Sequence, residues 1–134
     1  MDAAQTGSRG GRFVRQVGRS PARVRLVRKD LRRWLEQAGV PAEGVNEVIL
    51  ACSEACANAV EHPLRSERPL VEVEAALDGR ELELRVRDFG IWREQPASPM
   101  HGRGLHIIRK LMDSLDVRRT AQGTELVIRR SFST

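Results

Sequence analysis

The chain has 134 residues, of which 40% are hydrophobic and 31% charged, as is ordinary for a soluble globular protein of one domain. No apolar run approaches the roughly 18 to 20 residues of a membrane helix, and the N-terminus lacks the apolar segment of a secretory signal, so we expect a cytoplasmic protein. Aromatic residues make up only 4%, so the core should consist mainly of Val, Leu, Ile and Ala.

The net charge of +5 and a pI near 10.5 indicate an acidic partner. Nucleic acid is one candidate, but the aromatic side chains on which single-stranded or RNA bases stack are scarce. Most of the excess charge lies between residues 9 and 33, in Arg12, Arg15, Arg19, Arg23, Arg25, Arg28, Lys29, Arg32 and Arg33. This basic segment fits either a solvated helix face or a docking surface for an acidic partner.

The N-terminal part of the chain predicts a tail, a strand and a helix. Residues 1–11 are polar and contain Gly, so we expect a disordered tail before a single domain over 12–134. Residues 13–17 could form a short edge strand. Ser20-Pro21 predicts a helix start, with Ser as N-cap and Pro in the first turn, and Gly39 predicts its end.

The next helix has the clearest pattern in the chain. Apolar side chains fall on one stripe at the helical period, and polar ones fall on the other side. The apolar stripe comprises Val45, Val48, Ile49, Cys52, Cys56, Ala59 and Val60, and the polar side comprises Glu47, Glu54, Asn58 and Glu61. Pro63 marks the end. Glu54 and Asn58 therefore form an i, i+4 pair on the polar face.

The two cysteines, Cys52 and Cys56, lie four residues apart on the apolar stripe. Adjacent turns of one helix seldom give the geometry of a disulfide, and no second Cys/His pair at ligand spacing supports a metal site. We predict that both are small buried hydrophobic residues.

The second half of the chain predicts two hairpins separated by a loop and a helix. Alternating apolar residues over 70–77 and 81–86 flank Asp78-Gly79, a strong hairpin signal. A loop follows over 91–101, and a helix opens at Gly102-Arg103-Gly104 and continues to Leu115. Residues 116–119 and 124–130 then form a closing hairpin. We predict an α+β, two-layer sandwich with a mostly antiparallel, mixed sheet and its helices on one face.

Three pieces of this chain could carry chemistry, although each alone is weak. Glu54 could act as a general base and Asn58 could ligate a hard cation, or both could simply face solvent. Asp88, before Gly90 at a strand end, could accept a hydrogen bond from a purine amino group, or belong to an ordinary turn. Gly102 and Gly104 at a helix start could cradle phosphates, with Arg103 adding a charged contact, or form only a loop and cap.

The joint occurrence of these pieces, with Gly123-Thr124 in a late turn, is much more specific. In this order the sequence resembles the histidine-kinase-like ATPase superfamily, and within it the bacterial anti-sigma-factor serine/threonine kinases. The helix motif resembles S-E-A-x-x-N-A-x-x-H, which spans residues 53–62 here. The likeness covers residues 13–130. It departs from the family at Pro63, and in the loop over 91–101, which has two prolines and no glycine.

The resemblance implies an ATP site with Mg²⁺, in which Asn58 ligates the metal and Glu54 is the general base. It implies adenine recognition by Asp88 beside Gly90, with Thr124 behind it. The same resemblance implies phosphate contacts from the G-x-G-L segment and a polar contact at the helix end. Those contacts fall on Gly102, Arg103, Gly104, Leu105 and His62, with Arg103 near the terminal phosphate.

The implied function is a protein kinase that sequesters a sigma factor and phosphorylates a STAS-type anti-anti-sigma protein. An ATP-gated binding module without kinase activity would use the same pocket. A basic nucleic-acid-binding domain would explain the Arg-rich segment but would leave the motifs unexplained. The family commonly dimerises through its N-terminal strand and first helix, which implies a homodimer that the positive charge of this helix opposes.

Overall fold

A computed structural model describes residues 10–18, 20–61, 66–90, 99–121 and 123–132. The elements follow in the order β1 (Gly10–Gly18), α1 (Pro21–Gln37), α2 (Ala42–Glu61), β2 (Ser66–Asp78), β3 (Glu81–Gly90), α3 (Pro99–Leu111), β4 (Ser114–Thr120) and β5 (Gly123–Ser131). The strands form one sheet in the order β1-β2-β3-β5-β4. This confirms the predicted α+β element order, although every strand pairing is antiparallel rather than mixed.

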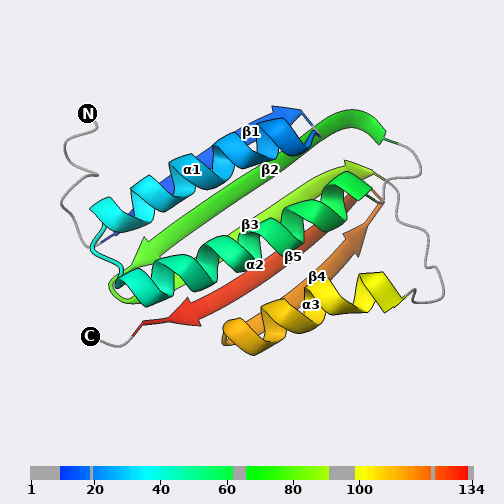
Figure 1. Cartoon of the computed structure of the whole chain (residues 1–134). Coiled ribbons are helices and arrows are strands. Elements are labelled where there is room, and N and C mark those ends of the chain that lie inside the picture. Colours follow the sequence, from blue (N-terminus) through cyan, green and yellow to red (C-terminus); the bar gives the residue numbers. More distant parts are fainter. Residues whose placement is uncertain (1–9, 19, 62–65, 91–98, 122, 133–134) are drawn as a thin grey trace.

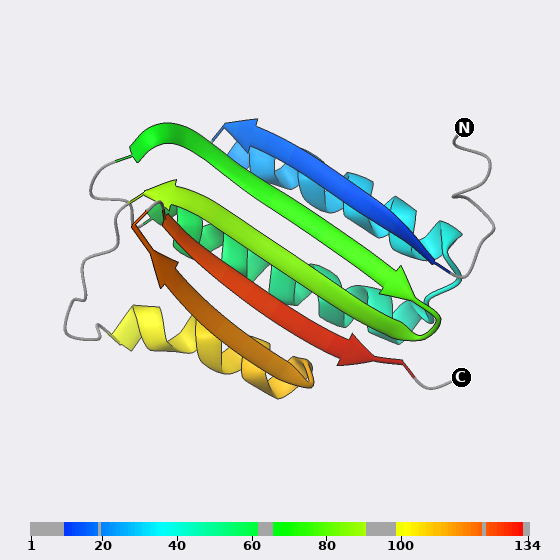
Figure 2. The same cartoon turned by 180° about the vertical axis from the view of Figure 1, so that it is seen from behind.

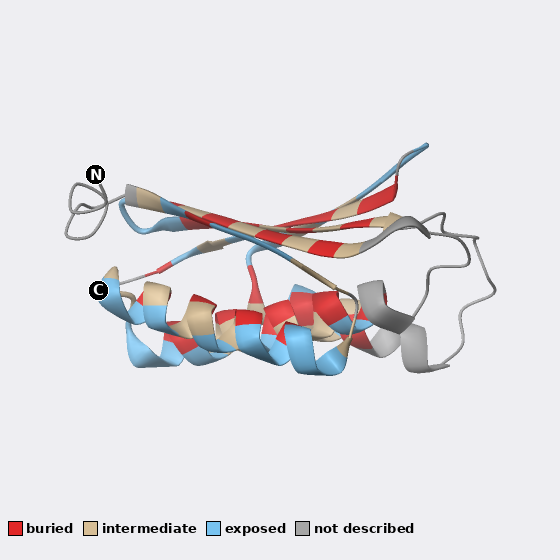
Figure 3. Cartoon of the chain, turned by 90° about the horizontal axis from the view of Figure 1, so that it is seen from above, coloured by how far each residue is buried: buried red, intermediate tan, exposed pale blue. Residues whose placement is uncertain are grey.

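The three helices pack side by side on one face of the sheet, so the molecule has two layers (Figures 1 and 2). Buried residues lie between the layers, on the inward sides of helices and strands (Figure 3). The core consists largely of Val, Leu, Ile and Ala, as the composition predicts, with Phe13 and Phe132 among its aromatic members. None of the described helices combines the length and apolar character required to cross a membrane.

Helix α1 starts and ends at the residues that the sequence predicts. The Ser20 side chain accepts a hydrogen bond from the backbone N–H of Arg23, and Pro21 opens the helix. Gly39, just beyond the C-cap residue Ala38, has φ +86°, a conformation that glycine adopts without strain. Local signals in the sequence therefore predict both ends of α1 correctly.

The predicted hairpin between β2 and β3 is present, with its turn displaced by one residue. Asp78 pairs with Glu81, so Gly79 and Arg80 form the two-residue loop. Only Gly79 has positive φ (+63°) among the described residues of this loop, which is the pattern of a type II′ turn.

Helix α3 differs from the predicted helix at both ends. It begins at Pro99, three residues before Gly102, and ends at Leu111, because Leu115 already belongs to β4. Proline is favoured in the first turn, and the sequence places Ser98 before Pro99, the same pair that opens α1. Strand β1 also begins earlier than predicted, since Gly10 and Gly11 pair with β2, while residues 1–9 of the predicted tail lie outside the described residues.

Cys52 and Cys56 are both free and fully buried, which confirms their assignment as small core residues. Their sulfur atoms lie 3.9 Å apart. The hydrogen bond between the two thiols, together with burial, raises the pKa of the Cys52 thiol well above its usual value. The thiol form is therefore favoured, and it is unreactive.

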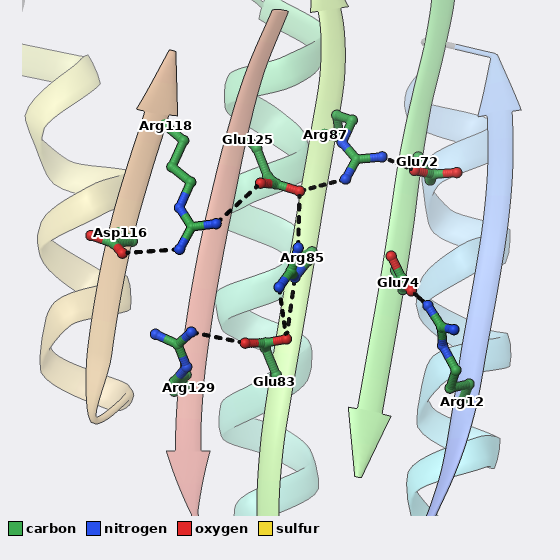
Figure 4. Close-up of polar contacts among 10 residues, drawn as sticks. All are labelled: Arg12, Glu72, Glu74, Glu83, Arg85, Arg87, Asp116, Arg118, Glu125 and Arg129. Atoms are coloured by element: carbon green, nitrogen blue, oxygen red, sulfur yellow. Dashed lines mark hydrogen bonds and ion pairs between the residues drawn. The ribbon is translucent and has the colours of Figure 1, made fainter. Parts of the chain in front are cut away.

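The sheet face opposite the helices carries a network of arginine–carboxylate pairs (Figure 4). Glu125 on β5 contacts Arg87 at 2.5 Å, Arg85 at 3.6 Å and Arg118 at 3.9 Å. Arg87 also contacts Glu72 on β2 at 2.7 Å, so the network crosses several strands. We call the ten residues drawn in Figure 4 the open-face network. Its long side chains explain how an outward strand position such as Val127 can be fully buried.

Candidate functional site

The polar face of α2 does not point into solvent near its C-terminal end. Asn58 is 7% exposed, and its Nδ2 atom has no hydrogen-bond partner among the described residues. A buried amide without a partner is costly unless a ligand or water supplies one, so Asn58 is a candidate for ligand contact. Glu54, one turn earlier, is half-buried on the same face. Asn58 therefore does not face solvent, which was the alternative interpretation of the Glu54 and Asn58 pair.

Ser53, the first residue of the predicted helix motif, fixes the rotation of α2. Its hydroxyl donates to the carbonyl of Ile49 at 2.8 Å and accepts a hydrogen bond from Arg28 of α1 at 3.1 Å. Because Ser53 points toward α1, the next residue along the helix, Glu54, turns toward α3. Sequence reasoning missed this role, since nothing in the local pattern links Arg28 to Ser53.

Helix α3 brings Gly104 against this polar face. A Cβ atom placed on Gly104 would lie 3.2 Å from Glu54 Oε1 and 3.7 Å from both polar side-chain atoms of Asn58. Gly104 is buried, so the two helices are in close contact at this point. The absent side chain leaves the carboxylate and the amide accessible beside the backbone of α3.

The strands bring together the second part of the site. Asp88 and Thr124 are direct partners in the β3–β5 ladder, and they are 3% and 2% exposed. The hydroxyl of Thr124 has no hydrogen-bond partner among the described residues. A buried carboxylate beside a buried hydroxyl is a suitable recognition surface for a polar ring edge.

Gly123 makes this strand pairing possible. Its φ is +153°, and a Cβ atom there would lie 2.0 Å from the carbonyl oxygen of Asp88. Any other residue would push β5 away from β3 where Asp88 and Thr124 meet. The sequence indicates Gly123 only as a turn residue, because the close contact arises from the pairing of distant strands.

These pieces meet at one end of the molecule, on the right in Figure 1. The C-terminal half of α2, the end of β3, the start of β5 and the N-terminal half of α3 all reach this end. The structure therefore brings together the predicted residues Glu54 and Asn58 with Gly104, and Asp88 with Thr124. Leu105 packs partly against the core, so its contact with a ligand stays a prediction.

Four predicted site residues are described incompletely or not at all. Only the backbone is described for Gly90, at the end of β3, and for Gly102 and Arg103, within α3. His62 lies outside the described residues. Because α3 begins at Pro99, Gly102 lies in its fourth position rather than at its start, so the free amides of the first turn precede the two glycines. This corrects the predicted helix start, while phosphate binding by Gly102, Arg103 and Gly104 stays a prediction.

The donor set fits a nucleotide with a weakly held hard cation. The described residues contain no group of three or more His, Cys, Asp or Glu side chains that could hold a metal by themselves. Mg²⁺ commonly keeps several waters and binds substrate phosphates with only one or two protein ligands. The Asn58 amide could supply one such ligand. Asp88 and Thr124 would then be available to bind the adenine ring.

Comparison with known proteins identifies the family. Residues 18–130 match the histidine kinase-like ATPase domain. The chain is 28% identical over 121 residues to the anti-sigma F factor of Clostridium kluyveri, with 81% of this chain and 85% of the relative covered. It is 26% identical over 104 residues to the anti-sigma F factor of Clostridium acetobutylicum, with 68% and 73% covered.

A solved structure shows the same fold. The RsbU and RsbW domains of Rv1364c from Mycobacterium tuberculosis superpose with a TM-score of 0.77 at 24% identity, covering 92% of this chain. The match spans 33% of that longer chain. The fold, the motif order and the extent of the family match agree, and we conclude that this chain belongs to the histidine kinase-like ATPase domain family, with anti-sigma factors among its relatives.

Proposed function

We propose that this chain is an ATP-dependent serine/threonine protein kinase of the anti-sigma-factor type. It would sequester a sigma factor and transfer phosphate to a STAS-type anti-anti-sigma protein. The family match supports the nucleotide, and the names of the clostridial relatives support the class of partner. The observation that carries the proposal is the contact of Gly104 with Glu54 and Asn58, beside unpartnered buried polar atoms.

The proposed roles follow from where each side chain lies. Asp88 on β3 and Thr124 on β5 are both buried, and they would bind the polar edge of the adenine ring. The first turn of α3 would offer its free backbone amides to the phosphates, and Gly104 would leave room for them beside Glu54. Bound Mg²⁺ would neutralise phosphate charge, and Asn58 would hold it.

Glu54 would accept the proton of the incoming serine or threonine hydroxyl, whose oxygen bonds to the γ-phosphorus as the bond to the β–γ bridging oxygen breaks. Its half-buried position beside Gly104 supports this role, since the carboxylate would lie next to the phosphates. Glu54 therefore acts on the transfer step, whereas Asn58 acts on binding.

Calorimetric titration with ATP, with and without Mg²⁺, tests the binding half of the proposal. We expect Mg²⁺ to strengthen ATP binding in the wild type, and Asn58→Ala to abolish that increase. Unchanged Mg²⁺ dependence in this variant would contradict the metal assignment. No affinity for ATP in folded wild-type protein would defeat the proposal as a whole.

Incubation with labelled ATP and STAS-type candidates encoded nearby tests the transfer half. Label on a serine or threonine of the candidate supports kinase activity. ATP binding without any transfer would instead support the ATP-gated binding module.

A further inference from the structure

Arg130, near the end of β5, joins three elements at the end of the molecule away from the candidate site. Its Nη1 atom donates to the backbone carbonyl of Leu111 at 2.5 Å and lies 2.6 Å from Glu47 Oε1 on α2. Its guanidinium also lies 5.6 Å from the centre of the Phe132 ring. The side chain is partly buried, so these contacts are shielded from solvent.

The contact with Leu111 is at the C-terminus of α3. The last carbonyls of a helix have no partner within the helix, and a cation there interacts favourably with the helix dipole. Glu47 balances the charge of Arg130 as an ion pair, and its Oε1 atom has no hydrogen-bond partner among the described residues. Removing Arg130 would therefore leave the Leu111 carbonyl without this donor and the Glu47 carboxylate without its counter-charge.

The same pair of helices forms the candidate site about two turns away. On α2, Glu47 precedes Glu54 by seven residues, or roughly 10 Å of helix. On α3, Leu111 follows Gly104 by the same number. The two helices run antiparallel (Figure 1), so the contact at Glu47 and Leu111 and the contact at Glu54 and Gly104 are two points on one interface.

Between the two points, α2 carries small buried residues and α3 carries a buried isoleucine. Ala51 and Ala55 of α2 and Ile108 of α3 are fully or almost fully buried. The helices can therefore approach closely, as the Gly104 contact requires. Leu111 and Gly104 belong to one helix, so the placement of Leu111 constrains the placement of Gly104.

We propose that Arg130 is a positioning residue for the nucleotide site. By holding the C-terminus of α3 against Glu47, it fixes the separation of Gly104 from Glu54 and Asn58. This inference rests on the proposed function, in which α3 lies along the phosphates of ATP. Arg130 touches no proposed ligand atom and acts only through the placement of α3.

Arg129 provides a matched control, because it precedes Arg130 in β5 and also pairs with a glutamate. It contacts Glu83 at 2.9 Å, but on the open face of the sheet, away from α2 and α3. We expect Arg130→Met to raise the Kd for ATP by about tenfold and Arg129→Met by less than about twofold. The Kd is measured calorimetrically with Mg²⁺, well below each variant's Tm. Equal increases in the two variants would overturn the inference.

The affinity for adenosine distinguishes a positioning role of Arg130 from a general destabilisation of the fold. Its proposed contacts, Asp88 and Thr124, lie on the sheet rather than on α3. We therefore expect its affinity, measured by displacement of a fluorescent ADP analogue, to change by less than about twofold in Arg130→Met. An equal loss for ATP and adenosine would contradict a positioning role. Arg130→Lys keeps the cation and should recover part of the ATP affinity.

A milder variant covers the case in which Arg130→Met does not fold. Glu47→Gln keeps the hydrogen bond from Arg130 to Leu111 and removes only the ion pair, so we expect a rise in the Kd for ATP of about threefold. An unchanged Kd in this variant would overturn the inference. Wild-type protein without ATP affinity would defeat the proposed function itself, whereas a binding wild type with indistinguishable Arg129 and Arg130 variants would defeat only the positioning role.

Discussion

Glu54 combines access with proximity to the proposed phosphates, since it is half-buried and faces the backbone of Gly104. We expect Glu54→Gln to keep ATP affinity within about twofold and to lose phosphate transfer by at least about 100-fold, because the amide cannot accept the proton. Calorimetry gives the affinity, and transfer of labelled phosphate to the partner gives the rate. Transfer at the wild-type rate would remove Glu54 from the mechanism.

We expect the substitution Gly104→Ala to lower the affinity for ATP without lowering the stability of the fold. Within a helix, Ala is favoured over Gly by roughly 0.5–1 kcal/mol, so the Tm of Gly104→Ala should hold or rise. The new Cβ would lie 3.2 Å from Glu54 Oε1 and displace that carboxylate, so ATP affinity should fall. Thermal unfolding and calorimetry on one sample measure both effects. Undiminished affinity would show that the site does not depend on this close contact.

At the scale of single residues, the sequence predicts which side chains share a helix face but not what covers them. The i, i+4 spacing of Glu54 and Asn58 correctly placed both on one side of α2. That Asn58 is buried depends on α3, which packs there from far along the chain. Arg130 carried no signal at all, because a charged residue near a strand end is common and its partners are distant in sequence.

Strand β5 meets β3 through Gly123, where a side chain has no room. We expect Gly123→Ala to lower the free energy of unfolding by about 3–4 kcal/mol, since it combines an unfavourable φ with a backbone clash at Asp88. Gly79→Ala is the control. It shares a positive φ but meets no atom within 4 Å, so it should lose only about 1–2 kcal/mol. Urea unfolding compares the two, and equal losses would contradict the clash.

At the scale of elements, the sequence predicts an element correctly where the signal for its ends lies within a few residues of them. Ser20-Pro21 and Gly39 fixed the ends of α1, and alternation fixed the β2–β3 hairpin. The glycines at 102 and 104 predict a helix start that is three residues too late, although Ser98-Pro99 repeats the pair that opens α1. The sheet order, which pairs β3 with β5, needs the whole chain and follows from no single segment.

Glu83, a member of the open-face network, should make the stability of the whole molecule depend on pH. Burial tends to raise the pKa of Glu83, but its hydrogen bond from Arg85 and the charges of Arg85 and Arg129 outweigh burial and lower it below 4.5. A lowered pKa in the folded state means that this stabilisation is present above the unfolded value of 4.5 and is lost as pH falls through the folded pKa.

Glu83→Gln tests this dependence. The wild type should exceed the variant in stability at neutral pH, and the difference should shrink on acidification below pH 4.5. Urea unfolding across this range measures it. Since the pairs are partly exposed, added salt should also reduce the difference. A difference that stays constant with pH would exclude Glu83 as its source.

The charge balance of the open-face network also affects the long-range electrostatic attraction between this protein and other molecules. Its five arginines and five carboxylates cancel, so this face exerts little long-range force, and the net charge of +5 must come from elsewhere. Helix α1 alone carries six basic and two acidic residues, a balance of +4. Collisions with acidic proteins are therefore oriented before contact, with α1 leading, and such encounters slow as ionic strength rises.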